Sequence, residues 1–454
     1  MDVPSDSGSH VFHFFLNRNY VSIAKGEGVY LFDAQGNRYL DASGGPILCS
    51  IGHGNTEFAS ILARQAERLA YVHRVDFSSP PLEEAAEKLC QCTQGKMDKV
   101  FFVSGGSEAM EIGVKIARKY HLDKGCPHRD QVISRWQSYH GSTAGALSWT
   151  GNTGRRNDFF PHMGNAHHIP PAYCYRCWFN RTPDSCDLEC AQALENEILC
   201  LGPDRVSVFI AEPVSGMSLC GVCPREGYFK RIREICHRYG VLLMLDEIMT
   251  GMGRTGKMFA HEHEGIVPDI LALGKGLGGG YFPIGAVAVP SHIHGVIARG
   301  SGAFGAGHSW GGNPLGCAVV SKTIDFIREH DLVERSRTMG AYLRKRLEEL
   351  ASHPLVGDIR GRGLMQGIEF VADKATRAPL DPKLAFSARL SAACLDEGMF
   401  IEYGSGCDRG RAGDMVMFGP PFIITRAEID EAVDTLKRVL ETDLLSREGQ
   451  FQTF

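Results

Sequence analysis

Two side chains near the middle of the chain, Asp246 and Lys275, have the types and the setting for covalent chemistry with a carbonyl group. Asp246 follows the apolar run 241–245, and Lys275 follows the apolar run 269–273. Such runs are typical of buried strands in a parallel sheet, and open sheets of this kind place ligands at the carboxyl ends of their strands. A desolvated lysine that faces a carboxylate is suited to forming a Schiff base with an aldehyde.

The backbone around this lysine is rich in glycine. Lys275 lies between Gly274 and Gly276, and residues 278–280 are all glycine. Because glycine tolerates tight bends and leaves room beside the backbone, this segment can accommodate a bulky group next to the amine.

The segment SGGSEA, residues 104–109, has the composition of a phosphate-binding turn. It lies between the apolar run 99–103 and a helical pattern, so unpaired backbone N–H groups at a helix N-terminus would lie beside Gly106 and the hydroxyl of Ser107. A simple tight turn with an N-cap is the alternative interpretation.

Three further side chains complete a candidate site. Tyr139 follows a predicted strand, where its ring could stack on a flat ligand or belong to the core. Glu212 lies near the end of another strand, where it could order a ring hydroxyl or cap a turn. Ser309 belongs to the glycine-rich loop 305–314 and could reach a phosphate, including one bound by a neighbouring subunit.

The segment GMGRTG, residues 251–256, matches a nucleotide-binding pattern that we consider misleading here. Asp246 and Glu247 precede it and would repel a pyrophosphate, and Met258 stands where a P-loop needs a hydroxyl for magnesium. A Rossmann dehydrogenase therefore remains only a distant alternative. A phosphate cup, an aromatic face, an acid and a condensing lysine together indicate pyridoxal phosphate as the cofactor.

The order of the predicted elements indicates an α/β fold, with a mostly parallel central sheet covered by helices on both faces. We expect an N-terminal segment over residues 1–54 that joins a small domain, a large cofactor-binding domain over 55–325, and a C-terminal small α+β domain over 326–454. Predicted strands lie at 99–103, 131–136, 206–214, 241–245, 269–273, 367–370 and 415–418, and predicted helices at 56–71, 82–92, 228–239, 332–351, 381–397 and 425–442.

The composition argues against several classes of partner. The 454 residues carry a formal net charge of −5 and lack a long basic stretch, which argues against nucleic acid. No signal peptide or membrane-length apolar run is evident, so we expect a cytoplasmic protein with no membrane partner. Its fifteen cysteines are then expected to be reduced.

These motifs resemble those of the class III aminotransferases, enzymes of pyridoxal-phosphate fold type I. The similarity runs from GVYLFDAQGNRYLD through SGGSEA, YHG, AEPV and LLMLDEIMTGMGRTG to ALGKGLGGGYFPIGA, GHSWGGNP and GRGLMQGIEF. The resemblance implies that Lys275 carries the aldimine, Asp246 pairs with the pyridinium nitrogen, and Tyr139 stacks on the ring. It also implies phosphate contacts from Gly106 and Ser107, and a position for Glu212 near the ring hydroxyl.

The same resemblance implies a reaction and an assembly. An ω-amino acid or amine would donate its amino group to a 2-oxo acid such as pyruvate or 2-oxoglutarate in a ping-pong cycle. Ser309 would bind the phosphate of the partner subunit in a homodimer with shared active sites, with a tetramer as a further possibility; the family usually has threonine at this position. A pyridoxal-phosphate racemase, epimerase or aminomutase on the same scaffold is the main alternative.

Residues that select the substrate are harder to assign. Family members often use a mobile arginine shortly before a PPF segment, and DRGRAGDMVMFGPPF offers Arg409 and Arg411 for this role, although both could be solvated loop charges. Tyr20 could line the same entrance or belong to a hinge. The segment 44–48 lacks a tryptophan that some amine transaminases carry, which argues against large aromatic donors.

One cysteine-rich loop lies outside the family pattern. Its four cysteines follow the spacing C-x2-C-x8-C-x3-C, which would suit zinc or an iron–sulfur cluster. Packing of thiols or pairing between them is the alternative, and we expect no metal. The four residues are Cys174, Cys177, Cys186 and Cys190.

Overall fold

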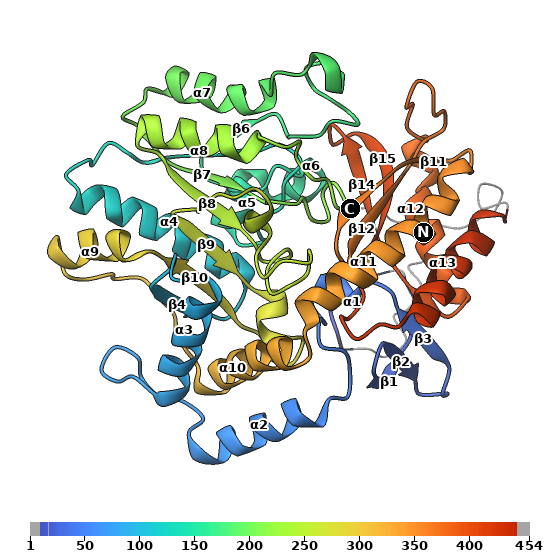
Figure 1. Cartoon of the computed structure of the whole chain (residues 1–454), viewed down its shortest axis with the longest axis horizontal. Coiled ribbons are helices and arrows are strands. Elements are labelled where there is room, and N and C mark those ends of the chain that lie inside the picture. The colour runs from blue at the N-terminus through green and yellow to red at the C-terminus, as the bar shows by residue number, and fades with distance from the viewer. Residues whose placement is uncertain (1–9, 17, 443–454) are drawn as a thin grey trace.

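A seven-stranded sheet forms the centre of the larger part of the molecule (Figure 1). The structure, a computed structural model, describes residues 10–16 and 18–442. Only β10 runs antiparallel to its two neighbours, so the predicted mostly parallel sheet is confirmed. The strands, in spatial order, are β4 (Lys99–Val103), β10 (Gly285–Val289), β9 (Ile270–Leu273), β8 (Leu242–Asp246), β7 (Val206–Ala211), β5 (Gln131–Arg135) and β6 (His167–Ile169).

Helices bury both faces of this sheet because its central strands are apolar along their whole length. In β8, Leu243 and Leu245 enter one hydrophobic cluster, whereas Met244 enters another. Alternate side chains of a strand point to opposite faces, so each face has its own core. The first cluster receives α3 (Pro80–Cys92), α7 (Glu189–Leu201), α8 (Tyr228–Tyr239) and α10 (Pro314–Glu329), and the second receives α4 (Gly106–Asp123), α5 (Ala144–Trp149) and α9 (Ser291–Arg299).

Two four-stranded sheets form the smaller part. One joins the N-terminal meander to the C-terminal half of the chain, because β3 pairs in parallel with β13. The first sheet holds β1 (Ile23–Glu27), β2 (Tyr30–Asp33), β3 (Arg38–Asp41) and β13 (Met399–Phe400); the second holds β11 (Val356–Arg362), β12 (Met365–Phe370), β15 (Ala412–Phe418) and β14 (Glu402–Asp408). The helices of this smaller part are α11 (Leu332–Glu348), α12 (Phe386–Asp396) and α13 (Arg426–Leu440). Three further helices occur elsewhere in the chain: α1 (Gly44–Ile47), α2 (Thr56–Arg68) and α6 (Thr153–Arg156).

Two details differ from the sequence-based expectation. The helix predicted over 381–397 begins only at Phe386, because Pro382–Leu384 forms a short 3-10 turn capped by the Asp381 side chain. The predicted domain boundary at 325/326 falls within α10, which is continuous through Glu329. The division into domains therefore stays a prediction.

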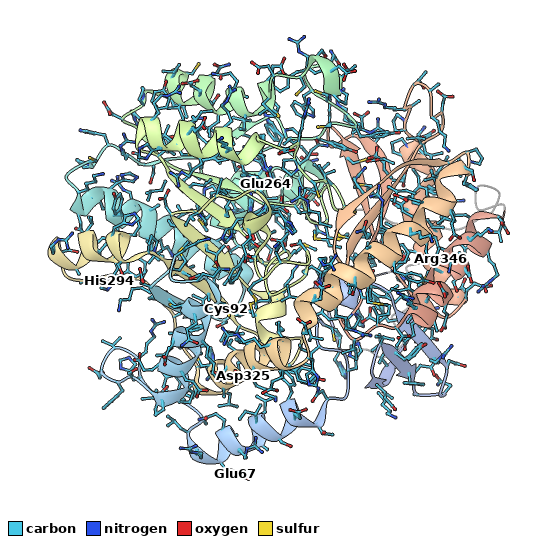
Figure 2. All side chains as sticks on the ribbon, viewed as in Figure 1. Glu67, Cys92, Glu264, His294, Asp325 and Arg346 are labelled. Atoms are coloured by element: carbon cyan, nitrogen blue, oxygen red, sulfur yellow. The ribbon has the colours of Figure 1, made fainter. Side chains whose placement is uncertain are left out.

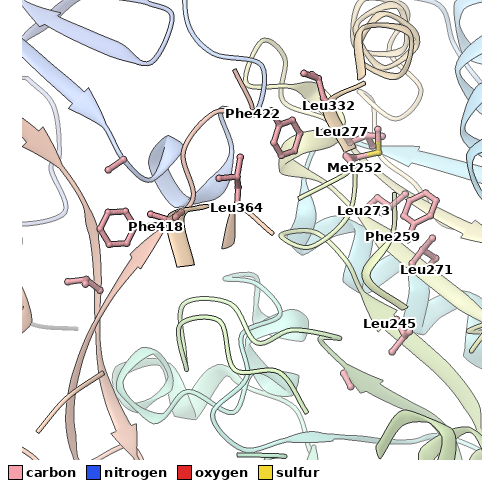
Figure 3. Close-up of a cluster of buried hydrophobic side chains, with 14 of the residues drawn as sticks. Leu245, Met252, Phe259, Leu271, Leu273, Leu277, Leu332, Leu364, Phe418 and Phe422 are labelled. Atoms are coloured by element: carbon pink, nitrogen blue, oxygen red, sulfur yellow. The ribbon is translucent and has the colours of Figure 1, made fainter. Parts of the chain in front are cut away.

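The two parts share one hydrophobic core. Figure 3 shows Leu245 and Leu271 of the large sheet in the same cluster as Phe418 and Phe422 of the C-terminal segment. Arg254 adds a polar link, since its Nη1 donates to the carbonyl oxygens of Leu364 (3.1 Å) and Pro420 (2.6 Å) and its guanidinium lies 4.4 Å from the ring centroid of Phe422. The GMGRTG segment thus connects the two parts.

None of the helices in the described part of the chain combines the length and apolar character needed to cross a membrane. All fifteen cysteines lie among the described residues, and none of them forms a disulfide.

A buried ion network in β12 should be important for stability. Glu369 is fully buried and accepts from Arg360 Nη1 (2.6 Å), Arg176 Nε (2.5 Å) and the Tyr173 hydroxyl. Burial opposes its ionisation, but the charges of Arg360 and Arg176 outweigh that effect and lower the pKa of Glu369. Removing the negative charge would take from Arg176 the carboxylate with which it pairs and would leave Arg360 with Asp358 alone (2.9 Å).

We expect Glu369→Gln to lower the free energy of unfolding by about 3 kcal/mol, measured by urea denaturation. Glu349→Gln is the matched control, because the exposed Glu349, which directly follows α11, pairs only with Arg346 (2.9 Å). Figure 2 labels Arg346. Loss of this pair should cost less than about 1 kcal/mol. Equal effects of the two substitutions would contradict this role for Glu369.

Candidate active site

Lys275 lies two residues after the end of β9, in a strained backbone conformation. Its φ angle is 43°, in the left-handed region that residues with a side chain rarely adopt. Burial lowers the pKa of its amine to about 8, whereas the negative charges of Asp246, Glu402 and Glu212 act in the opposite direction. The fold therefore holds an amine that is partly neutral near physiological pH.

The amine opens into a cavity of about 290 Å³ at the carboxyl ends of the parallel strands. This is the edge of the sheet at which the sequence predicted a ligand. The cavity is lined by Leu48, Ser104, Gly105, Gly106, Ser107, Tyr139, His140, Gly141, Glu212, Val214, Asp246, Ile248, Met249, Thr250, Lys275, Phe282, Pro283 and Ile284.

Asp246 is the last residue of β8 and is held on both carboxylate oxygens. Oδ2 lies 2.8 Å from Nδ1 of His140, and Oδ1 accepts from the backbone N–H of Ile248 at 3.0 Å. Both Asp246 and His140 are buried. These contacts fix the direction of the buried carboxylate at the wall of the cavity.

The N-terminus of α4 forms one wall of the cavity. Gly105 is the N-cap, and the Ser107 hydroxyl oxygen accepts from the Ser142 N–H at 3.0 Å. Gly141 has a φ angle of 138°, and a Cβ added there would lie 2.5 Å from Ser107 Oγ. Only glycine fits this close approach. The first N–H groups of α4 have no partner within the helix, and the residues that carry them line the cavity.

Glu212 follows β7 directly and is buried. Its Oε1 accepts from the Gly216 N–H at 2.9 Å, whereas Oε2 is buried and has no hydrogen-bond partner among the described residues. Burial raises the pKa of this carboxyl group, with a further contribution from the charge of Asp246. A buried oxygen without a partner indicates a polar ligand group at this point.

Tyr139 lies at the side of the cavity, half-buried, with its ring 5.1 Å from Cζ of Arg155. The cation lies within the range of a cation–π contact, which helps to fix the ring. The structure thus brings together six of the predicted residues: Gly106, Ser107, Tyr139, Glu212, Asp246 and Lys275.

Four other predicted residues lie outside the lining of this cavity. Ser309 is exposed in the loop after α9, and Tyr20 is 45% exposed, with its hydroxyl accepting from the Phe15 N–H at 2.9 Å. Arg409 and Arg411 are exposed at the turn between β14 and β15, where Arg409 lies over the Trp178 ring at 5.6 Å. A role for these side chains in binding stays a prediction.

The cysteine-rich loop contains four thiols but no arranged metal site. Across residues 10–16 and 18–442, no group of three or more His, Cys, Asp or Glu side chains is placed to hold a metal ion. All four cysteines have free thiols. The alternative of zinc or an iron–sulfur cluster therefore gains no support from the geometry.

Two residues that interact with Asp246 or Lys275 had no assigned role in the sequence. His140 belongs to the YHG motif, but its contact with Asp246 crosses from the end of β5 past β7 to β8, and no local spacing reveals it. Glu402 is at the start of β14 and interacts electrostatically with Lys275. Nothing in the sequence of this strand, EYGSGCD, marks it as a residue of the site.

Comparison with known proteins identifies the family. The family model described as Aminotransferase class-III matches residues 16–440. The chain is 36% identical to a diaminobutyrate–2-oxoglutarate transaminase of Halomonas elongata, over 95% of this chain and 92% of the relative. It is 34% identical to a putrescine–pyruvate aminotransferase of Pseudomonas aeruginosa, over 92% and 91%.

A solved structure agrees with these relatives. The (S)-enantioselective ω-transaminase of Thermomicrobium roseum superposes with a TM-score of 0.90 at 35% identity, over 98% of both chains. The fold and the family predicted from the motifs are thereby confirmed. This chain belongs to the class III aminotransferases, a family of pyridoxal-phosphate-dependent enzymes.

Proposed function

We propose that this enzyme transfers an amino group from an amine or ω-amino acid to a 2-oxo acid such as pyruvate or 2-oxoglutarate, with pyridoxal phosphate bound around Lys275. The observation that carries the proposal is the Lys275 amine, which has a lowered pKa and shares one cavity with the fixed Asp246 carboxylate. Relatives that act on diaminobutyrate and putrescine support donors with a primary amine on a carbon chain.

The residues of the cavity fit this cofactor. The N-terminus of α4, with Gly106 and Ser107, is suited to a phosphate dianion. The unpaired Oε2 of Glu212 is suited to a ring hydroxyl, and Tyr139 offers an aromatic face. The buried Asp246 supplies the negative charge that a protonated ring nitrogen needs.

The mechanism depends on how these side chains hold and move protons. Bound here, the cofactor supplies an aldehyde that condenses with amines and a ring that accepts electrons from a broken Cα–H bond. Asp246 keeps a proton on the ring nitrogen, and His140 keeps Asp246 in place. The Lys275 amine would serve as the base that takes the proton from the donor carbon and as the acid that gives it back, which its pKa of about 8 permits near neutral pH.

We also infer a homodimer in which Ser309 reaches the phosphate held by the partner subunit, with a tetramer as a larger assembly. Trp310, beside Ser309, is 61% exposed and lies 6.2 Å from the ring of Tyr71, which is itself exposed. Exposed aromatic pairs of this kind favour burial in an interface. A cytoplasmic location stays a prediction from composition.

The half-reaction tests the proposal against a racemase, epimerase or aminomutase. With amine donor alone, we expect the cofactor absorbance to convert from the aldehyde to the amine form, and added 2-oxo acid to restore it. Exchange of the Cα hydrogen without a net change in absorbance, and without need for a 2-oxo acid, would favour the alternative reactions instead.

Replacement of the lysine tests its central role. We expect Lys275→Ala to lower turnover by at least about 10³-fold, because it removes both the covalent anchor and the proton carrier, and to abolish borohydride-reducible attachment of the cofactor. Lys257→Ala, at an exposed lysine nearby, is the matched control. Retention of turnover and of attachment in Lys275→Ala would refute the assignment.

The pH dependence of cofactor uptake by the apoprotein tests the lowered pKa of the Lys275 amine. Only the neutral amine condenses, and its fraction rises as the pH passes the pKa, so the rate should increase to a plateau with a midpoint near pH 8. An unperturbed lysine would give a midpoint of about 10.4. In Asp246→Asn the midpoint should fall further, because the Asp246 charge raises the pKa of Lys275. An unchanged midpoint in the variant would contradict this coupling.

A further inference from the structure

Cys49, His53 and Asp41 form a row of a thiol, an imidazole and a carboxylate beside the active site. Nδ1 of His53 lies 3.7 Å from Sγ of Cys49, and Nε2 of the same ring lies 3.1 Å from Oδ2 of Asp41. Because His53 contacts the other two through different ring nitrogens, the three groups lie in series and do not surround a metal position. A thiol in contact with an imidazole that a third group orients is the arrangement by which proteins activate a nucleophile.

The backbone anchors all three residues of this row. Oδ1 of Asp41, at the end of β3, accepts from the Gly44 N–H at 2.7 Å. The Cys49 N–H donates to the Gly44 carbonyl oxygen at 2.9 Å. The backbone of His53 exchanges two hydrogen bonds with Gly28, at 2.8 and 3.0 Å. The row is therefore part of the fixed structure of the protein.

The contacts of His53 give its ring a positive charge. The hydrogen bond to Asp41, followed by the one to Cys49, raises the pKa of His53 to about 10, against the effect of burial. At neutral pH the imidazolium donates from Nε2 to the carboxylate and from Nδ1 to the sulfur. A positive charge beside a cysteine sulfur favours the thiolate, which is the form of cysteine that reacts.

The space around the sulfur admits only a small reagent. Cys49 is 8% exposed, and the side chain of His53 beside it is 23% exposed. Gly280 packs closely against the cysteine, since a Cβ added to this glycine would lie 3.0 Å from Cα and 3.3 Å from Sγ of Cys49. Hydrogen peroxide is close to water in size and suits such a site better than a bulky electrophile.

We propose that Cys49 is a site of oxidation by hydrogen peroxide. The thiolate sulfur attacks one peroxide oxygen, and an S–O bond forms as the O–O bond breaks. The hydroxide that leaves takes up the proton that the thiol had lost, so the thiol and the peroxide give a sulfenic acid and water. The sulfur loses two electrons and the peroxide gains them. This reactivity goes beyond the proposed transaminase function and does not depend on it.

The test measures how fast each cysteine of the holoenzyme is oxidised at pH 7. After a short exposure to hydrogen peroxide, catalase removes the oxidant, and the protein is unfolded in urea with dimedone, so that trapping of sulfenic acid does not depend on access. By mass spectrometry we expect Cys49 to be labelled at least about tenfold faster than Cys200, an exposed thiol on α7. Burial raises the pKa of Cys394 to about 12, so this buried reference should stay unlabelled.

Replacement of the histidine tests the activation itself. In His53→Gln, which removes the positive charge, the labelling rate of Cys49 should fall at least about tenfold, whereas that of Cys200 should not change. His73→Gln is the matched control, because it removes an exposed histidine that pairs with Asp76 (2.7 Å), and it should leave both rates unchanged.

Two results would overturn the proposal: labelling of Cys200 as fast as that of Cys49 in the unaltered protein, or an unchanged rate for Cys49 in His53→Gln. The first comparison needs no substitution, so it decides the matter if His53→Gln does not fold. Neither measurement uses turnover, so failure of this proposal and failure of the transaminase function are distinguishable.

Discussion

The site depends on the burial of one amine, that of Lys275, close to one carboxylate, that of Asp246. Asp246 lies at the end of β8, level with Ala272 of the adjacent β9, and Lys275 follows three residues later. Parallel pairing of two apolar strands therefore brings the acid and the amine to the same edge. Removal of water lowers the pKa of the amine, and the nearby carboxylates limit that effect, so the protein sets the protonation of Lys275 by a balance of two opposing forces.

Much of the candidate site could be predicted from the sequence because its residues lie at the carboxyl ends of strands. Asp246 ends a buried strand, and Lys275, Glu212 and Tyr139 follow buried strands within a few residues. The polarity of a parallel sheet collects such residues at one edge. His140 could not be assigned, since its contact with Asp246 joins strands that are not neighbours. Strand β10 was also missed, because GAVAV lacks the large apolar residues that marked the other strands. The exposed Arg409 shows that a charge close to a motif need not face the cavity.

The GMGRTG segment illustrates how a short motif can belong to packing rather than to ligand binding. None of its six residues lines the cavity, and Arg254 is buried against the carbonyl oxygens of Leu364 and Pro420. Burial lowers the pKa of Arg254 to about 9, which indicates how completely this guanidinium is removed from water. Membership of the aminotransferase family excludes the dehydrogenase alternative that the glycines suggested.

The pairing of β3 with β13 has a consequence for how the protein matures on the ribosome. The N-terminal meander is synthesised first, yet its last strand, which pairs with β2, acquires its second neighbour only when residues 399–400 emerge. The hydrogen bond from the Glu402 N–H to Ser43 Oγ has the same delay. Long-range pairing of this kind slows folding and leaves early strands without partners. A nascent chain that already contains Lys275 and Asp246 would therefore still lack the strand that completes this sheet, so the smaller part of the molecule would be the last to gain its full set of strand partners.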